Sequence, residues 1–310
     1  MPPDQPRTTS HWCHLVLQGC LLLCLGFATL PARAAQILLT ASESNDAMLA
    51  FTQALAKLRP SDQVSFSRIS DLPAPRQLPA GARLILLDPA SLDWRLQDHL
   101  GPPTLVMSIS RVQAHERLGE LRPSHLSLLW SDPPPARQLR LIRAMLPEVR
   151  RVGVLYSHNS EFLLLETRRA ARSLGLEIVT RRWNDTFDSQ PLQTLLNDSE
   201  VLLGLDDPTL YNPSTAKRLL LSCYTRRQAL IGPTASFVWA GSLASTYSSE
   251  QDWLYTLDDL LDRPPTRWPR AQYAKRFNVL SNPQVARSLG IEDIDESALA
   301  NRLTSGEVHP

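Results

Sequence analysis

The sequence predicts an α/β fold made of two Rossmann-like lobes, each a doubly wound parallel sheet, joined by a hinge of several crossings. Two observations support this prediction. Short apolar runs that are typical of buried strands alternate along the chain with amphipathic patterns of helical period. Proline-rich segments, Pro133–Pro135 and Pro264–Pro265, interrupt this alternation where a chain that crosses between lobes continues neither helix nor sheet.

The expected strands are short apolar runs flanked by polar or turn-forming residues. They are Gln36–Leu39, Arg83–Leu87, Thr104–Met107, Val152–Tyr156, Glu177–Thr180, Val201–Leu205, Ala229–Ile231 and a run near Ser242–Thr246. A further apolar segment, His125–Trp130, precedes the first proline-rich crossing. Regular alternation of such strands with helices favours parallel sheets, because a parallel connection needs a crossover.

The expected helices lie between these runs. Their ranges are about Asp46–Leu58, Arg137–Leu146, Ser160–Leu174, Pro213–Arg227, Glu250–Leu261 and Pro283–Leu289. Asn212-Pro213 and Asn282-Pro283 each pair an N-cap residue with proline at the first helical position, and Gly175 and Gly290 stand where a helix C-terminus favours glycine.

The two proline-rich crossings divide the chain. We assign residues 1–34 to a signal peptide, residues 35–131 plus about 247–264 to the first lobe, and residues 132–246 plus about 265–310 to the second lobe. Because the chain passes between the lobes more than once, the two lobes form a hinged clamp.

The N-terminal segment has the pattern of a secretory signal. Leu15–Leu30 is almost free of charge and ends at Pro31-Ala32-Arg33-Ala34-Ala35, a small-residue cleavage site. The run is shorter than the ~20 residues that a membrane span needs. We expect cleavage after Ala34 and a periplasmic location; the alternatives are a retained anchor and lipoprotein-like processing at Leu17-Gln18-Gly19-Cys20.

The composition of the mature chain excludes some partners. Without residues 1–34 it has 30 basic and 30 acidic residues, so no basic excess attracts nucleic acid. Only Cys223 of the four cysteines remains, which excludes an intramolecular disulfide. We expect a monomer stabilised by its core.

The candidate binding site lies where strands end, because the carboxyl ends of parallel strands open onto a crevice ringed by helix N-termini. The strongest signal is Val201–Leu205 followed by Asp206-Asp207. Hydroxyls can hold a carboxylate, an aspartate can pair with an ammonium, and aromatic rings can stack on an apolar body, which suits an amino acid or a related metabolite. The candidate residues are Ser42, Ser44, Asn45, Asp88, Ser108, Ser110, Tyr156, Asn159, Asp206, Asp207, Tyr211 and Trp239.

Each candidate also has a structural interpretation. Ser42, Ser44 and Asn45 can cap the first helix, and one of Asp206 and Asp207 can serve a turn. Tyr211 and Trp239 can be packing residues. Arg111 can bind an anion, but the adjacent stretch His115–Arg117 has the pattern of a solvated helix face.

The sequence favours a binding protein over an enzyme. It contains no nucleophile elbow, no H-E-x-x-H zinc motif and no glycine-rich phosphate or dinucleotide motif. The histidines are scattered without metal-ligand spacing. We therefore predict no catalytic residue, no metal and no cofactor.

Several segments together resemble a known family. They are Leu141–Tyr156, Ala170–Glu177, Asp207-Pro208-Thr209, Gly241–Ala244, and Phe277–Asn282 with Val285–Ile291. This set is similar to periplasmic substrate-binding proteins of ABC transporters, in the tryptophan- and tyrosine-type branch with a type I periplasmic-binding fold. The resemblance covers residues 136–295, and the first lobe matches only in layout.

The resemblance implies capture of a small molecule between two lobes for ABC-type import, with an inner-membrane permease as partner, and it favours Asp207 over Asp206 as the ligand contact. One departure affects the ligand: Ser108-Ile109-Ser110-Arg111 stands where many members carry an Asp-Pro turn. The alternative function is a ligand-sensing or protein-interaction module that regulates an envelope partner such as a periplasmic sensor. A hydrolase is a third, weaker alternative.

Overall fold

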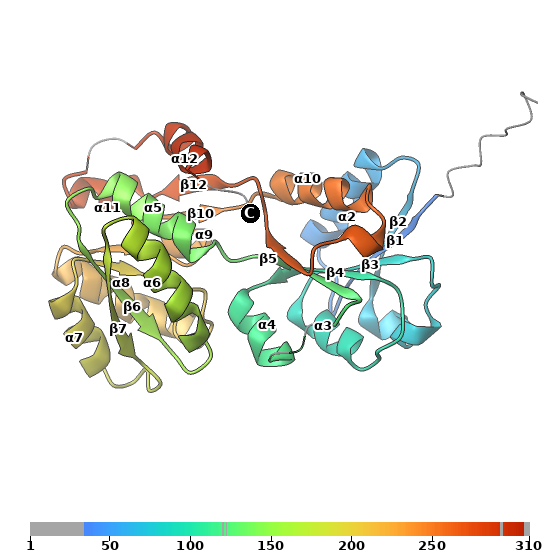
Figure 1. Cartoon of the computed structure of the whole chain (residues 1–310), viewed down its shortest axis with the longest axis horizontal. Helices are drawn as coiled ribbons and strands as arrows, with labels where there is room; N and C mark the ends of the chain where they lie inside the picture. The colour runs from blue at the N-terminus through green and yellow to red at the C-terminus, as the bar shows by residue number, and fades with distance from the viewer. Residues whose placement is uncertain (1–33, 120, 122, 292–293, 307–310) are drawn as a thin grey trace, which may run out of the picture. The chain divides into compact units, whose positions relative to one another are not determined.

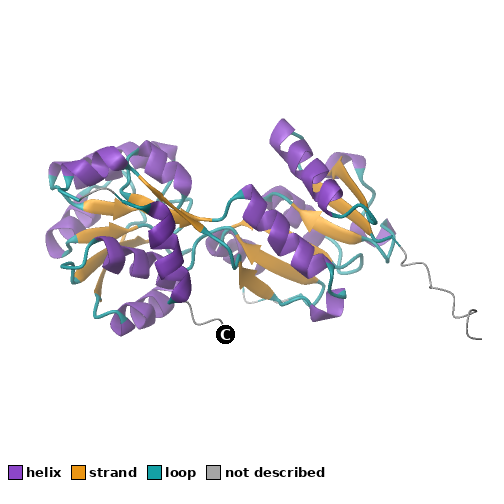
Figure 2. Cartoon of the chain, turned by 90° about the horizontal axis from the view of Figure 1, so that it is seen from above, coloured by secondary structure: helices purple, strands orange, loops and turns teal. Residues whose placement is uncertain are grey.

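The computed structural model describes residues 34–119, 121, 123–291 and 294–306, and the expected signal peptide lies almost wholly outside them. The described residues form two six-stranded sheets with helices on both faces (Figures 1 and 2). We call each sheet with its helices a lobe. The predicted class, an α/β fold of two lobes with predominantly parallel sheets, is confirmed.

The first sheet has the strand order β11-β5-β4-β3-β1-β2, and all its neighbouring strands are parallel. Its strands are β1 (Gln36–Ala41), β2 (Gln63–Arg68), β3 (Arg83–Leu86), β4 (Thr104–Ile109), β5 (Leu126–Trp130) and β11 (Ala271–Tyr273). Its helices are α2 (Asp46–Leu58), α3 (Pro89–Leu96), α4 (Arg111–Leu118) and α10 (Glu250–Leu261), with the short helices η1 (Ile69–Asp71), η2 (Pro75–Gln77) and η4 (Pro265–Arg267).

The second sheet has the order β12-β10-β9-β8-β6-β7 and is parallel except for the edge strand β12, which runs antiparallel to β10. Its strands are β6 (Arg151–Tyr156), β7 (Glu177–Arg182), β8 (Val201–Leu203), β9 (Ala229–Ile231), β10 (Ala244–Tyr247) and β12 (Asn278–Ser281). Its helices are α5 (Pro135–Met145), η3 (Glu161–Leu163), α6 (Leu164–Ser173), α7 (Gln190–Asp198), α8 (Pro213–Thr225), α9 (Ala235–Ala240), α11 (Pro283–Ser288) and α12 (Glu296–Ser305).

The central strands β8 and β9 of the second sheet are buried on both faces, which explains why they are continuous apolar runs. Val201 and Leu203 of β8 pack into one cluster with residues of α5 and α6, whereas Leu202 points to the other face and packs with residues of α7, α8 and α9. The period of two along a strand thus divides each run between two cores. As a consequence, α8 and α9 lie on the opposite face of the sheet from α5 and α6.

Local signals in the sequence fix several helix ends. The side chain of Asn212 accepts hydrogen bonds from the backbone N–H groups of Ser214 and Thr215 at the start of α8. Asn282 caps α11 in the same way. Pro135, expected in a crossing, is instead the first residue of α5, where the missing N–H of proline leaves no bond unmade.

One boundary differs from the prediction. Residues from about 265 onward were expected in the second lobe, but β11 pairs with β5 and so belongs to the first sheet. The segment has no apolar run that indicates a strand; only the long-range pairing of Ala271 with Leu128 and of Tyr273 with Trp130 makes it one. Among the described residues, no helix is both long and apolar enough to cross a membrane.

Candidate functional site

At the carboxyl edge of the first sheet, the loops after β1 and β3 are joined by Asp88. Its Oδ2 accepts hydrogen bonds from the backbone N–H (2.7 Å) and the hydroxyl (2.5 Å) of Ser42. Its Oδ1 accepts from the N–H of Ser91 (2.7 Å) and caps α3. Both oxygens of this carboxylate are therefore engaged within the lobe. Although burial alone raises the pKa of Asp88, these hydrogen bonds hold it below its usual value.

In the second lobe, Asp207 joins two loops in the same way, because it accepts hydrogen bonds from both. Its side chain is fully buried, and Oδ2 accepts from the hydroxyls of Ser157 (2.6 Å) and Ser160 (2.5 Å) in the loop after β6. Its Oδ1 accepts from the N–H (3.0 Å) and hydroxyl (2.6 Å) of Thr209. Four hydrogen bonds to the protein saturate this carboxylate. The geometry thus favours the structural interpretation of Asp207 over the ligand contact that the resemblance implies.

Asp206 has a different environment. Its carboxylate accepts no hydrogen bond and forms no ion pair with any described residue, and its side chain is only partly exposed. Its backbone carbonyl lies 3.4 Å from the hydroxyl of Ser110, which caps α4 in the first lobe. Asp206 is therefore the free carboxylate of the pair, and it lies where the two lobes meet.

A second carboxylate, Asp132, lies near Asp206. It follows β5 and is 6% exposed, and its Oδ1 accepts from the backbone N–H of Arg111 (2.8 Å). Burial, together with the negative charge of Asp206, raises the pKa of Asp132 to about 7. Burial and the charge of Asp207 raise the pKa of Asp206 to about 6. Two acids from two lobes thus share a poorly solvated space that favours a bound cation or a proton.

Arg111 borders this pair without neutralising it. Its Nη1 donates to Glu166 Oε2 of α6 (2.6 Å) and to the hydroxyl of Tyr273 (2.9 Å). Although burial alone lowers the pKa of Arg111, these partners raise it above its usual value. Its guanidinium also lies 5.7 Å from the ring centroid of Phe162. The side-chain hydrogen bonds of Arg111 thus connect β11 of the first sheet to α6 of the second lobe.

The stretch after Arg111 is not the solvated helix face that the sequence predicted. The ring of His115 stacks on Phe162 of η3, with 4.3 Å between centroids. Glu116 Oε1 accepts from the side-chain amide of Asn159 (2.5 Å). The contacts are made by residues from the two lobes, and a single sequence window cannot reveal them. They place Asn159, one of the candidate residues, beside α4.

Ser108 is held in a conformation that most residues avoid. Its φ is +54°, and the register between β4 and β5 shifts between Val106 and Ile109. The bulge leaves Ser108 exposed and turns Ser110 inward, so that Ser110 is fully buried. Strain of this kind is often kept at sites that bind a ligand.

The structure does not gather all the candidates at one place. Asn45 caps α2 by accepting from the N–H of Met48 (2.8 Å), and Ser44 is exposed without a hydrogen bond of its own side chain. Tyr156 lies under the guanidinium of Arg182, 5.5 Å from the ring centroid. These positions leave Ser44 and Tyr156 as untested candidates near strand ends.

Two aromatic candidates make no described contact with the carboxylate of Asp206. Tyr211 is 6% exposed and packs edge-to-face on Phe237 in the core of the second lobe. Trp239 is 75% exposed on α9, and no described contact joins it to the strand-end residues. The packing interpretation fits Tyr211, whereas Trp239 belongs to a separate surface.

The sequence analysis missed Asp132 because it stands beside Pro133–Pro135 and was included in the crossing. It follows β5 directly, so the strand-end rule that selected Asp206 also selects Asp132. Within the described residues, no group of three or more His, Cys, Asp or Glu side chains is arranged to hold a metal ion.

No protein-family model and no curated protein matches the chain. Among solved structures it is similar to a ligand-free, open substrate-binding protein with adhesive properties from Clostridium difficile, at 16% identity and a TM-score of 0.64 over 84% of this chain and 97% of that one. It is also similar to an ABC domain in complex with L-Trp from Streptococcus pneumonia, at 18% identity and a TM-score of 0.57 over 86% and 97% of the two chains. The similarity is one of fold: the chain has the two-lobed fold of periplasmic-binding proteins.

Proposed function

We propose that this chain is a periplasmic solute-binding protein that holds a small molecule with a protonated amine between Asp132 and Asp206 and serves ABC-type import. The observation that carries this proposal is the pair of carboxylates itself. The carboxylate of Asp206 has no hydrogen bond or ion pair with a described residue. The carboxylate of Asp132 accepts one hydrogen bond from another residue, the backbone N–H of Arg111, and the charge of Arg111 only partly offsets its burial. A cationic group placed between them removes their repulsion and supplies the hydrogen bonds that they lack.

The neighbouring groups complete a site for an amino acid or a related amine. Ser108 offers an exposed hydroxyl near the end of β4, which neighbours β5, and Phe162 and His115 supply a stacked aromatic pair beside Arg111. An apolar surface next to an ammonium site suits a ligand whose body is apolar.

The export part of the proposal depends on the N-terminal segment. The apolar segment Leu15–Leu30 and the cleavage pattern at Ala34 support export. If the proposal holds, protein recovered from the periplasm begins at Ala35 or Gln36. A membrane-held species that retains Leu15–Leu30 contradicts it.

The ligand proposal is tested by thermal unfolding and calorimetry with amino acids and biogenic amines, each paired with its N-acetyl derivative. We expect an amine to raise the unfolding temperature and its N-acetyl derivative to have no effect, since only the charged amine pairs with the two carboxylates. Loss of a charged hydrogen bond in Asp206→Asn should weaken binding by roughly 1.5–3 kcal/mol.

Asp46→Asn is the matched control, because Asp46 is exposed in the first turn of α2, away from the pair. Equal binding of an amine and its N-acetyl derivative, or of the Asp206→Asn variant and the wild type, rules the cationic site out.

A further inference from the structure

The second lobe carries an apolar surface that its own fold leaves uncovered. We define the α8–α9 surface as Leu220, Leu221 and Tyr224 of α8, Trp239 of α9, and the cations Lys217 and Arg227. Leu221 is 54% exposed, Tyr224 71% and Trp239 75%. Large aromatic side chains at such exposure on neighbouring helices are unusual for a surface that faces only water.

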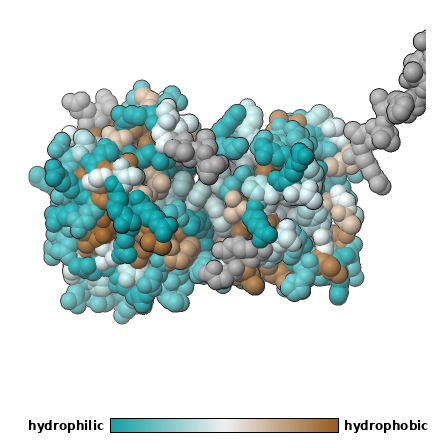
Figure 3. Space-filling model, in the orientation of Figure 1, coloured by the Kyte–Doolittle hydropathy of each residue, from teal (hydrophilic) through white to brown (hydrophobic). Residues whose placement is uncertain are grey.

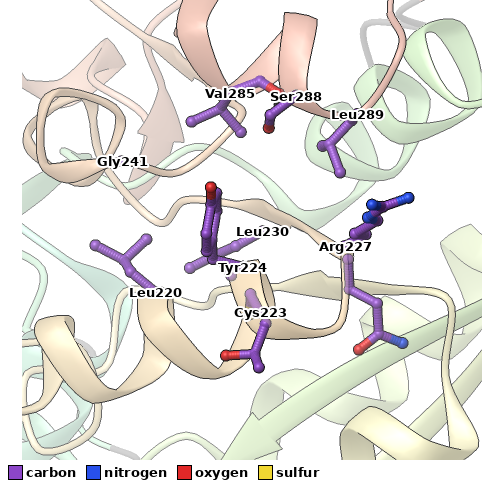
Figure 4. A pocket seen from close by; sticks show the side chains of 11 residues that line it. Leu220, Cys223, Tyr224, Arg227, Leu230, Gly241, Val285, Ser288 and Leu289 are labelled. Atoms are coloured by element: carbon purple, nitrogen blue, oxygen red, sulfur yellow. Dashed lines mark hydrogen bonds between the residues drawn. The ribbon is translucent and has the colours of Figure 1, made fainter.

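Two grooves are lined by the α8 residues of this surface and by its two cations. A groove of about 640 Å³ lies between α8 and α9 and is lined by Lys217, Leu221 and Phe237 among others. A second groove of about 500 Å³ lies between the end of α8 and α11, and Arg227, Leu230 and Leu289 line it. Figure 4 shows Tyr224 standing in this second groove and pointing toward α11. Leu220 lines both grooves and separates them.

The stretch of chain that contains α8 and α9 carries positive charge and no acidic residue. Residues 208–249 contain Lys217, Arg218, Arg226 and Arg227 and no aspartate or glutamate. None of these four cations forms an ion pair with a described residue. Elsewhere on the second lobe such pairs do form, for example between Asp198 and Arg181 (2.6 Å). The surface therefore presents unneutralised positive charge beside exposed apolar side chains.

The opposite face of the same sheet, covered by α5 and α6, differs in how its apolar and charged residues are distributed. The view in Figure 3, in which α5 and α6 cover the second lobe, shows hydrophilic residues between separate apolar patches. There Glu161 pairs with Arg182, and Glu166 pairs with Arg111. The combination of grooves, exposed aromatic residues and unpaired cations thus belongs to the α8–α9 surface.

We propose that the α8–α9 surface docks an acidic amphipathic helix of a partner protein. The two concave grooves suit apolar side chains spaced one turn apart, at i, i+3, i+4 and i+7 of a helix. Carboxylates on the flanks of such a helix complement Lys217 and Arg227, one of which borders each groove. An anionic bilayer is a poorer fit, because a flat lipid surface leaves concave grooves unfilled. The proposal is independent of the ligand site.

A displayed library of amphipathic helices tests the proposal. The helices have a fixed apolar stripe and random acidic, basic or neutral residues elsewhere, and they are selected against the protein purified after expression of the full chain. We expect selected helices to be enriched in Asp and Glu, and their binding to weaken as salt rises.

Two pairs of substitutions locate the binding. Leu221→Ser with Tyr224→Ser, and Lys217→Glu with Arg227→Glu, should each weaken a selected helix by about tenfold or more, since each pair changes one residue that lines each groove. Leu165→Ser with Arg169→Glu is the matched control: Leu165 is 56% exposed on α6, on the opposite face of the sheet, and these changes should leave binding unchanged.

Three outcomes overturn the proposal. They are selected helices without an acidic bias, binding that the α8–α9 variants do not weaken, and stronger binding of the protein to phosphatidylglycerol vesicles that Trp239→Ser abolishes. The last outcome assigns the surface to a membrane. Melting curves of each variant test whether it remains folded. We expect that it does, because the substituted side chains are exposed.

Discussion

Asp132 and Asp206 extend from strand ends of two different sheets, and the charge of Asp206 helps to raise the pKa of Asp132 to about 7. Arg111 is adjacent, but its side chain donates to Glu166 and Tyr273 instead of to either aspartate. The charge of Arg111 partly offsets the effect of burial on the pKa of Asp132, but neither aspartate forms an ion pair with a described residue.

The stability of the ligand-free protein should fall as the pH rises from 5 to 8. The pKa of Asp132 is about 7 in the folded chain against an ordinary value of 3.8, so the folded state retains a proton that the unfolded state loses. The stabilisation from this proton is fully present below the pKa that Asp132 has in the unfolded chain. It is lost as the pH rises through the pKa of Asp132 in the folded chain. Asp132→Asn should flatten this part of the profile by an amount on the order of 2–4 kcal/mol, measured by urea unfolding. An unchanged slope in the variant contradicts the assignment.

The affinity for a cationic ligand should change in the opposite direction. A protonated amine pairs with ionised carboxylates, so its affinity falls as Asp132 and Asp206 take up protons below their pKa values of about 7 and about 6. We expect calorimetry to give tighter binding at pH 8 than at pH 5. The double variant Asp132→Asn with Asp206→Asn serves as the control, in which no such trend should remain.

Asp207 should matter for stability more than for binding. Its carboxylate accepts four hydrogen bonds in a fully buried site, so Asp207→Ala leaves the hydroxyls of Ser157 and Ser160 without their acceptor. We expect the unfolding free energy to fall by about 3 kcal/mol or more. Asp185→Ala, in an exposed loop, should cost much less. A large loss of affinity with unchanged stability in Asp207→Ala restores the ligand role.

The ion pair of Arg111 and Glu166 should contribute modestly. The two side chains are 19% and 42% exposed, so water screens their attraction despite the 2.6 Å separation. A double-mutant cycle of Arg111→Ala and Glu166→Ala should give a coupling of about 0.5–1 kcal/mol that decreases as salt is added. A coupling of zero indicates that α4 and α6 are not joined by this pair in solution.

Gly153 should tolerate no side chain. A Cβ atom there meets the Ser199 hydroxyl at 2.5 Å and Leu202 Cδ2 at 2.7 Å, and both belong to closely packed elements. Gly153→Ala should therefore reduce the unfolding free energy by about 1–3 kcal/mol. Gly81→Ala is the matched control, because nothing lies within 4 Å of its added methyl group. Equal stability of the two variants contradicts this reading of the packing around β6.

Patterns within short windows were sufficient for much of the fold. The buried strands of both sheets are apolar runs, and capping residues such as Asn212 and Asn282 mark helix starts, because these signals act over a few residues. The edge strand β2 was not predicted, since its half-buried sequence alternates weakly. Of α4 only the stretch His115–Arg117 was interpreted as helical, because its apolar face is short. The strand-end rule likewise selected Asp206 and Ser110, which the structure brings together.

The sequence by itself determined the class of the fold, the apolar strands, the capped helices and the absence of familiar catalytic motifs, because each of these depends on neighbouring residues. Only the tertiary structure decided which carboxylate remains free. Asp206 and Asp207 are adjacent and chemically identical, yet Ser157, Ser160 and Thr209 saturate Asp207, while Asp206 lies toward Asp132, which is distant along the chain. The role of a carboxylate depends on the hydrogen-bond donors and charges that folding brings to it, and those come from other strands.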